Sequence, residues 1–362
     1  MLRLGRDNLF DYVRLYAALQ VALKHAYNYI DFPSAGLLAH IFTLSGVPVF
    51  FSLSGFLIGL SFLRSFRDRD FVKFFYRRIY RIYPALYVSF FLTFLLILCL
   101  SLHSNISVAD FAVWTLAQLS IFQYYAPSSI NDLSPVGNFN GSLWTIPVEL
   151  QFYSLALILL VINTRLPPLS SLAIRKLRSC IFLRAMLFLV FSVLLYLSFS
   201  IYSGGFDTQI RHLFPGRISQ LVFVSIISNS FPFLLGVVCI VPLYLLGAAR
   251  TSCFLVAVGV LAYCGLVTSD PSSSSSILAS SLVCCCFSIG IGLIKINTSF
   301  CLPFDLSYGI YIYHMPLINL LLIAKVSGLL SWLVFGLALP ILSLSSWFIV
   351  ERPALLRLRA AG

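Results

Sequence analysis

Ten long apolar stretches constrain the fold of this chain more than any other feature of its sequence. They are separated by short polar or basic segments and lie at 9–30, 41–63, 82–101, 144–163, 182–202, 231–247, 252–268, 276–294, 303–324 and 329–350. A helix needs about 20 apolar residues to cross the hydrocarbon core of a bilayer. Backbone groups in lipid must find partners within the protein, so apolar stretches of this length form helices. We therefore predict an all-α polytopic membrane protein with about ten transmembrane helices.

Composition supports this class and excludes an ordinary soluble domain. Of the 362 residues, 60% are hydrophobic and only 10% are charged, and the mean hydropathy is +0.97. In a soluble protein the net charge of +12 would suggest nucleic acid as a partner. In a membrane protein it reflects the excess of basic residues in cytoplasmic loops, so we expect membrane lipid and no nucleic acid as a partner. No break in composition or internal repeat divides the chain, which indicates one membrane domain over 1–362.

The basic residues also predict the orientation. With ten spans and a cytoplasmic start, 19 basic residues fall on the inner side and three on the outer side. Both termini are then cytoplasmic. An eleventh apolar segment, 108–125, is short and contains Asp110 and Gln118. As a full span it would place the basic loop 165–184 outside, so we predict a re-entrant or interfacial helix there.

The first span carries ionisable residues that are costly in lipid. Asp11, Arg14 and His25 fall close to one line along a helix, because the eleven residues from Arg14 to His25 make just over three complete turns. Arg14 and His25 would be about 16 Å apart along the axis. Ionisable groups in a span usually face a protein interior or a wet cavity and mark function. Buried polar groups satisfied by neighbouring helices are the alternative.

Two further motifs follow along the chain. The second span contains GVPVFFSLSGFLIG (46–59), in which Ser52, Ser54, Gly55 and Gly59 form a small-residue face suited to close helix packing. The next segment, FYRRIYRIYP (75–84), places Arg78 and Arg81 three residues apart at the predicted inner edge. Arginine forks suit phosphate oxygens. Anchoring to anionic lipid is the alternative for such a basic cluster.

Two further spans carry polar residues in apolar surroundings. LWTIPVELQFY (143–153) places Glu149 about two turns into the fourth span from the outer side. In this topology Glu149 and His25 share the outer half, where a carboxylate would orient the imidazole. LSYGIYIYHMP (306–316) places Tyr308, Tyr311 and His314 on one side of the ninth span. Their hydroxyls and ring nitrogen could bind sugar or donor, and an aromatic packing stripe with a satisfied histidine is an equally good reading.

Taken together, these stretches resemble the acyltransferase-3 family of integral membrane acyltransferases over nearly the whole chain. Six ordered motifs carry the resemblance: Asp11, Arg14 and His25; GVPVFFSLSGFLI (46–58); FYRRIYRIYP (75–84); LWTIPVELQFY (143–153); SYGIYIYHMP (307–316); and ERP (351–353). Leu150 departs from the pattern, since many members carry a second acidic residue there. The chain also resembles the stand-alone form of the family, without an appended SGNH-type hydrolase domain.

The resemblance implies O-acyl transfer, usually of acetyl, from cytoplasmic acyl-CoA to a hydroxyl of an extracytoplasmic or lipid-linked saccharide. Acetyl-CoA would be a co-substrate, with no permanently bound cofactor and no metal. The implied catalytic residues are His25 as general base and Glu149 as its helper. Arg14, Arg78 and Arg81 would bind the donor, and Asp11, Ser52, Ser54, Tyr308 and His314 would support the site. An acyl-histidine intermediate is a second route.

Other readings remain open at this stage. A saccharide transporter or flippase also places charges in helices, although paired repeats with interrupted spans are absent here. A scaffold subunit for envelope glycan assembly and an acyltransferase acting on a small hydroxylated molecule are further alternatives. The expected location is the cytoplasmic (inner) membrane of a bacterium. The acceptor sugar, the acyl length and a homo-oligomeric state are not readable from the sequence.

Overall fold

The structure is a computed structural model. It describes residues 5, 7–30, 45–68, 71–101, 106–123, 125–165, 181–205, 207–213, 221–222, 224–270 and 273–360. These residues form helices and no strand. The α-helices are α1 (Phe10–Tyr29), α3 (Gly46–Asp68), α4 (Phe71–Ser101), α5 (Val108–Leu119), α6 (Ser128–Asn131), α7 (Thr145–Arg165), α9 (Ile181–Tyr202), α10 (Asp207–Leu213), α12 (Ile226–Val238), α13 (Ile240–Leu246), α14 (Ala248–Thr268), α15 (Ser274–Gly292), α16 (Ser307–Ile323), α17 (Gly328–Ser346) and α18 (Arg352–Ala360). Three short helical segments are η2 (Gly141–Trp144), η3 (Thr298–Phe300) and η4 (Trp347–Glu351).

Each of the ten predicted spans contains helix, and the all-helical class is confirmed. Among the described residues, six helices are long and apolar enough to cross a membrane by themselves, and α16 is apolar but shorter. The number of spans and the location of the termini therefore stay predictions. The sixth predicted span is divided at Cys239 into α12 and α13. Residues 41–44 of the second span and most of the basic loop 165–184 lie outside the described residues.

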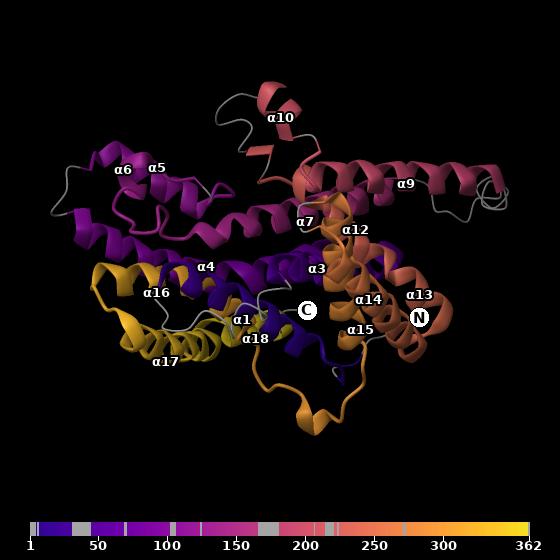
Figure 1. Cartoon of the computed structure of the whole chain (residues 1–362). Helices are drawn as coiled ribbons and strands as arrows, with labels where there is room; N and C mark the ends of the chain where they lie inside the picture. Colours follow the sequence, from indigo (N-terminus) through magenta and orange to yellow (C-terminus); the bar gives the residue numbers. More distant parts are fainter. Residues whose placement is uncertain are drawn as a thin grey trace.

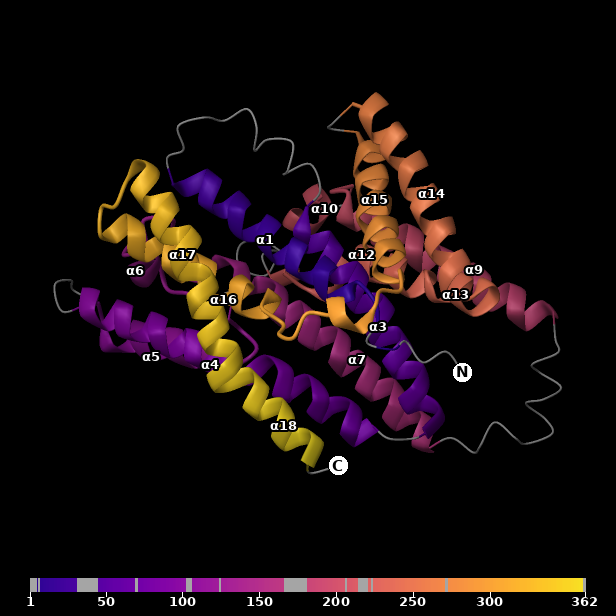
Figure 2. The same ribbon diagram turned by 90° about the horizontal axis from the view of Figure 1, so that it is seen from below.

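The segment expected to be re-entrant or interfacial forms the short helix α5. Its first turn is capped by Ser107, whose hydroxyl accepts a hydrogen bond from the Asp110 amide at 3.0 Å. Figure 2 shows α5 lying beside α4, and Trp114 of α5 is buried against the ring of Phe90. A twelve-residue helix is too short to cross a bilayer unaided. Its relation to the membrane remains a prediction.

The helices α3 and α12 approach each other closely through small residues, as the sequence predicted. A Cβ atom added at Gly55 of α3 would overlap the backbone oxygen of Phe233, and one at Gly236 of α12 would overlap that of Ser52. The two backbones are therefore in contact, an arrangement that small residues permit in lipid. The hydroxyl of Ser52 donates a hydrogen bond to the carbonyl of Pro232 at 3.1 Å.

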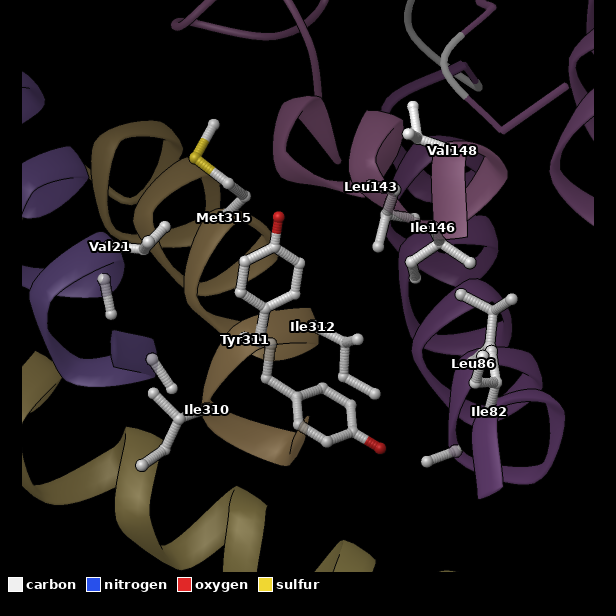
Figure 3. Packing of buried hydrophobic residues seen from close by; sticks show 14 of the residues in the cluster. Val21, Ile82, Leu86, Leu143, Ile146, Val148, Ile310, Tyr311, Ile312 and Met315 are labelled. Carbon is white, nitrogen blue, oxygen red and sulfur yellow. The ribbon is translucent and has the colours of Figure 1, made fainter. Parts of the chain in front are cut away.

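The helix α16 lies at the centre of the largest buried cluster. It packs against α1, α17 and α4, and α1 in turn contacts α3 and α15 (Figures 1 and 2). Figure 3 shows Tyr311 and its neighbours on α16 between α1 on one side and α4 and α7 on the other. Polar side chains on α16 therefore reach the protein interior instead of lipid.

Candidate active site

A cavity of about 120 Å³ lies among α1, α3, α4, α7 and α16. Apolar side chains such as Phe50 and Ile146 form part of its wall. Its charged and hydroxyl-bearing lining residues are Arg14, Ser54, Arg78, Arg81, Thr145, Glu149, Tyr153, Ser307, Tyr308 and Tyr311. All three predicted donor-binding arginines, one predicted catalytic residue and two predicted supporting residues thus come together here. This volume suits part of a ligand, since sites that enclose a whole cofactor are usually several hundred Å³.

One part of the cavity wall is held by two ion pairs. The Arg14 guanidinium bonds Asp11 on the same helix, with Nη1 and Oδ1 2.8 Å apart. The Arg81 guanidinium bonds Asp305, with Nη2 and Oδ2 3.1 Å apart. Asp305 also accepts hydrogen bonds from the amide and the hydroxyl of Ser307, at 3.2 and 2.5 Å. Two arginines from different helices are therefore fixed at the same cavity.

Asp305 was not identified from the sequence. The available signal was weak: a carboxylate two residues before the SYGIYIYHMP motif, at the start of an apolar stretch. Such a position is equally typical of an interfacial residue. Its pairing with Arg81 joins positions 224 apart in the chain, and no local pattern predicts that contact.

Arg78 and Glu149 occupy the same cavity and are connected through Tyr153. The Arg78 guanidinium carbon lies 5.3 Å from the centre of the Phe74 ring and 5.5 Å from that of Tyr153. Glu149 accepts hydrogen bonds from the Tyr153 hydroxyl and from Ser54, the latter at 3.3 Å. The Nε of Arg78 is buried and has no hydrogen-bond partner among the described residues. A buried donor of this kind is available to an anionic ligand.

Two tyrosines of α16 form another part of the wall, and both are tied to neighbouring elements. The Tyr308 hydroxyl donates to the carbonyl of Ile82 on α4 at 2.8 Å. The Tyr311 hydroxyl donates to the carbonyl of Ser142 in η2 at 2.8 Å and lies 2.6 Å from the hydroxyl of Thr145. The edge of the Tyr311 ring meets the ring of His314, with 5.9 Å between centres. Tyr311 therefore separates the cavity from His314.

His314 is paired with His25. The Nδ1 of His25 lies 3.0 Å from the Nε2 of His314. His314 is fully buried, whereas His25 is only partly buried. The two residues are 289 positions apart, and the contact of α1 with α16 brings them together.

Two expected arrangements differ from this geometry. Glu149 is bonded to Ser54 and Tyr153 near Arg78, and among the described residues the ring of His25 is bonded to His314 instead. Ser52 points away from the cavity and bonds the α12 backbone, so only Ser54 of the predicted serine pair lines it. Adjacent small residues on a helix face different neighbours, which the composition of the stretch could not distinguish.

A family model described as an acyltransferase domain matches residues 7–351. This match covers nearly the whole chain, from before α1 to the end of η4. The chain belongs to the acyltransferase-3 family. The six motifs of the family resemblance all fall within the matched residues, apart from the last two residues of ERP (351–353). The protein is therefore an integral membrane acyltransferase, with an acyl donor and an acceptor as its substrates.

Two members of known name are similar to this acyltransferase. Nodulation protein 10 of Rhizobium leguminosarum bv. viciae is 27% identical over 97% of this chain and 94% of its own length. An O-acetyl transferase of Shigella phage Sf6 is 33% identical over 41% of this chain and 44% of its own length. No solved structure matches the chain. The second relative has a name that specifies transfer of acetyl to oxygen.

Proposed function

We propose that this acyltransferase moves an acyl group, most simply acetyl, from cytoplasmic acyl-CoA to a hydroxyl of an extracytoplasmic or lipid-linked saccharide. One observation carries the proposal: a single cavity extends from three arginines to Tyr311, whose ring contacts one member of the His25–His314 pair. Acyl-CoA is anionic at one end and reactive at the other, which matches this arrangement. The name of the phage relative supports acetyl, and the family resemblance supports a saccharide.

The arginines would bind the donor. Arg14, Arg78 and Arg81 have guanidinium groups at the cavity, and the unpartnered Nε of Arg78 offers a hydrogen bond to a phosphate oxygen. With the predicted topology this part of the molecule is toward the cytoplasm, where acyl-CoA is found. Most of the donor would remain outside the cavity, with the narrow pantetheine arm inside it.

His25 would be the general base. Its imidazole takes the proton from the acceptor hydroxyl while the acceptor oxygen forms a bond to the acyl carbon. The bond from that carbon to the CoA sulfur breaks, and the proton passes from His25 to the sulfur. The products are the acyl ester and free CoA, and His25 is regenerated. Asp11 would keep Arg14 in position through their ion pair.

The geometry favours a different role for Glu149 from the one expected. It lies with Arg78 and is bonded to Ser54 and Tyr153, so we propose that its charge balances the arginines when the donor is absent. Tyr308 would hold α16 against α4 through its bond to Ile82. These roles assign donor binding to the arginine part of the cavity and chemistry to the histidines.

The proposal is tested by two assays on the same variants. The first measures acetyl groups on envelope glycans by mass spectrometry in cells carrying the wild-type gene, a deletion, or His25→Ala. The second measures CoA binding to the purified proteins. We expect His25→Ala to remove the acetyl mass and keep CoA binding, and Arg78→Ala to weaken CoA binding. Exposed residues outside the cavity provide matched controls, His212→Ala and Arg250→Ala.

The alternatives give different results in these assays. Glycans of unchanged mass that fail to reach the surface in the deletion strain would support a transporter. An acetylated small molecule in place of an acetylated glycan would change the acceptor class and keep the enzyme. Full acetylation by His25→Ala would overturn the catalytic assignment of His25.

A further inference from the structure

We infer that His314 is a positioning residue that fixes which nitrogen of His25 carries the proton, and so leaves the Nε2 of His25 free as the base. The inference rests on the proposed function for its chemical meaning, but the proton positions follow from the hydrogen bonds alone. It concerns two rings that the acyltransferase fold brings together from α1 and α16.

The hydrogen bonds and burial of His314 fix its tautomer. Its Nδ1 lies 3.2 Å from the carbonyl oxygen of Ile310, one turn earlier on α16. A carbonyl only accepts hydrogen bonds, so this Nδ1 must carry the hydrogen. His314 has no exposed surface, and no carboxylate among the described residues is bonded to it. Burial without an anionic partner favours the neutral ring, whose Nε2 is then an acceptor.

The tautomer of His314 in turn fixes the tautomer of His25. The Nε2 of His314 lies 3.0 Å from the Nδ1 of His25, while the ring centres are 5.1 Å apart and the planes differ by 14°. The nitrogens thus face each other along the line joining two nearly coplanar rings, as an N–H···N bond requires. Because Nε2 of His314 accepts, Nδ1 of His25 must donate. A neutral His25 then has its lone pair on Nε2.

The tautomer of His25 determines which nitrogen can act as the base in catalysis. Both ring nitrogens of His314 are occupied, and the ring is buried, so His314 cannot itself take a proton from a substrate. Only the Nε2 of His25 remains for that task. The wrong tautomer would present an N–H to the acceptor hydroxyl and could not act as a base. The Val21 carbonyl, one turn before His25, is a further hydrogen-bond acceptor near the His25 ring.

The experiment reads the proton positions directly. Protein labelled with ¹⁵N only at histidine is studied in lipid bilayers by solid-state NMR, and the chain has five histidines to distinguish. His25→Asn and His314→Gln identify the two sets of signals. In the wild type we expect the Nδ1–H pattern at both residues. An Nε2–H pattern at His25 in the wild type would overturn the inference.

Two substitutions at His314 then separate positioning from packing. His314→Gln keeps a side-chain oxygen that accepts from His25, whereas His314→Leu offers no acceptor. We expect His314→Leu to shift His25 toward Nε2–H and to lower kcat by about 10- to 100-fold with KM for acyl-CoA unchanged. His314→Gln should keep the Nδ1–H pattern and most of kcat.

Other results would contradict the positioning role. An unchanged Nδ1–H pattern of His25 in the His314→Leu variant would mean that the Val21 carbonyl is enough to keep the hydrogen on Nδ1. If both variants lost kcat equally while His25 kept its tautomer, the role of His314 would be packing alone. The NMR result also stands apart from the proposed function: the expected tautomers without any acyl transfer would overturn the reaction and keep the inference.

Discussion

Arg81 on α4 and Asp305, two residues before α16, are bonded across 3.1 Å although 224 positions separate them in the chain. The pair joins α4, which carries two of the arginines proposed to bind the donor, to the residues just before α16, which carries His314. Its side chains are partly accessible, with 37% of Arg81 and 21% of Asp305 exposed. The pair is therefore positioned to affect both stability and donor binding.

The first prediction concerns this pair. Asp305→Asn removes the charge that holds Arg81, and we expect a loss of about 1–2 kcal/mol in stability, limited by the partial exposure of both groups. KM for acyl-CoA should rise because Arg81 is no longer fixed. Thermal unfolding in detergent and donor titration measure the two effects. Asp132→Asn, at an exposed carboxylate directly after α6, is the control; equal effects in both variants would argue against the pair.

The second prediction separates the two serines of α3. Ser54 lines the cavity and bonds Glu149, whereas Ser52 is buried and bonds the carbonyl of Pro232. Ser52→Ala should cost about 1 kcal/mol of stability and leave KM unchanged. Ser54→Ala should alter KM for acyl-CoA and change stability less. Steady-state kinetics and melting temperatures of the two variants, measured side by side, test this; the reverse pattern would place Ser52 at the cavity.

The third prediction concerns the contact of α3 with α12. Gly55→Ala and Gly236→Ala each force a methyl group into the backbone of the opposite helix, so each should destabilise the protein by about 1–3 kcal/mol. Gly336→Ala is the matched control. Gly336 also lies within a helix, α17, and a Cβ atom added there would meet nothing within 4 Å. The melting temperature should fall for the first two variants only. An unchanged melting temperature of the Gly55→Ala variant would show that α3 and α12 can separate without cost.

The fourth prediction distinguishes two roles of Glu149. If its charge balances the arginines, Glu149→Gln should lower the melting temperature of the donor-free protein and increase the stabilisation given by CoA. The kcat should change by no more than about threefold, because Gln keeps an oxygen for Tyr153. Calorimetry with and without CoA, together with kinetics, tests this. A loss of kcat by 100-fold or so with unchanged CoA stabilisation would support the catalytic role expected from the sequence.

The sequence predicted those parts of the fold that depend on local pattern. Each of the ten apolar stretches contains helix, and the spacing of Ser52, Ser54, Gly55 and Gly59 predicted a close helix contact. The ionisable residues of the first span were expected to face inward, and Arg14 does line the cavity. These features follow from residue types along one helix, where lipid cost and helical periodicity act directly.

The contacts between distant segments could not be predicted in this way. His25 was expected to meet Glu149 because the predicted topology places both in the outer half of their spans, yet the His25 ring is bonded to His314. Depth in the membrane does not specify which helices are neighbours. Asp305 and Tyr153 were not singled out because each contacts an arginine of α4, a helix distant from it in the sequence. The packing order of helices decides such pairs, and a single sequence carries little information about it.

Three of the polar side chains of α16, those of Tyr308, Tyr311 and His314, each bond a different part of the protein. Tyr308 bonds α4, Tyr311 bonds η2 and His314 bonds α1. All three belong to one rigid helix, so a rotation or a shift by one residue along its axis would break the three bonds together. The three contacts at the site are therefore formed together or lost together. A chain in which this helix is misplaced would therefore be inactive as a whole instead of partly active.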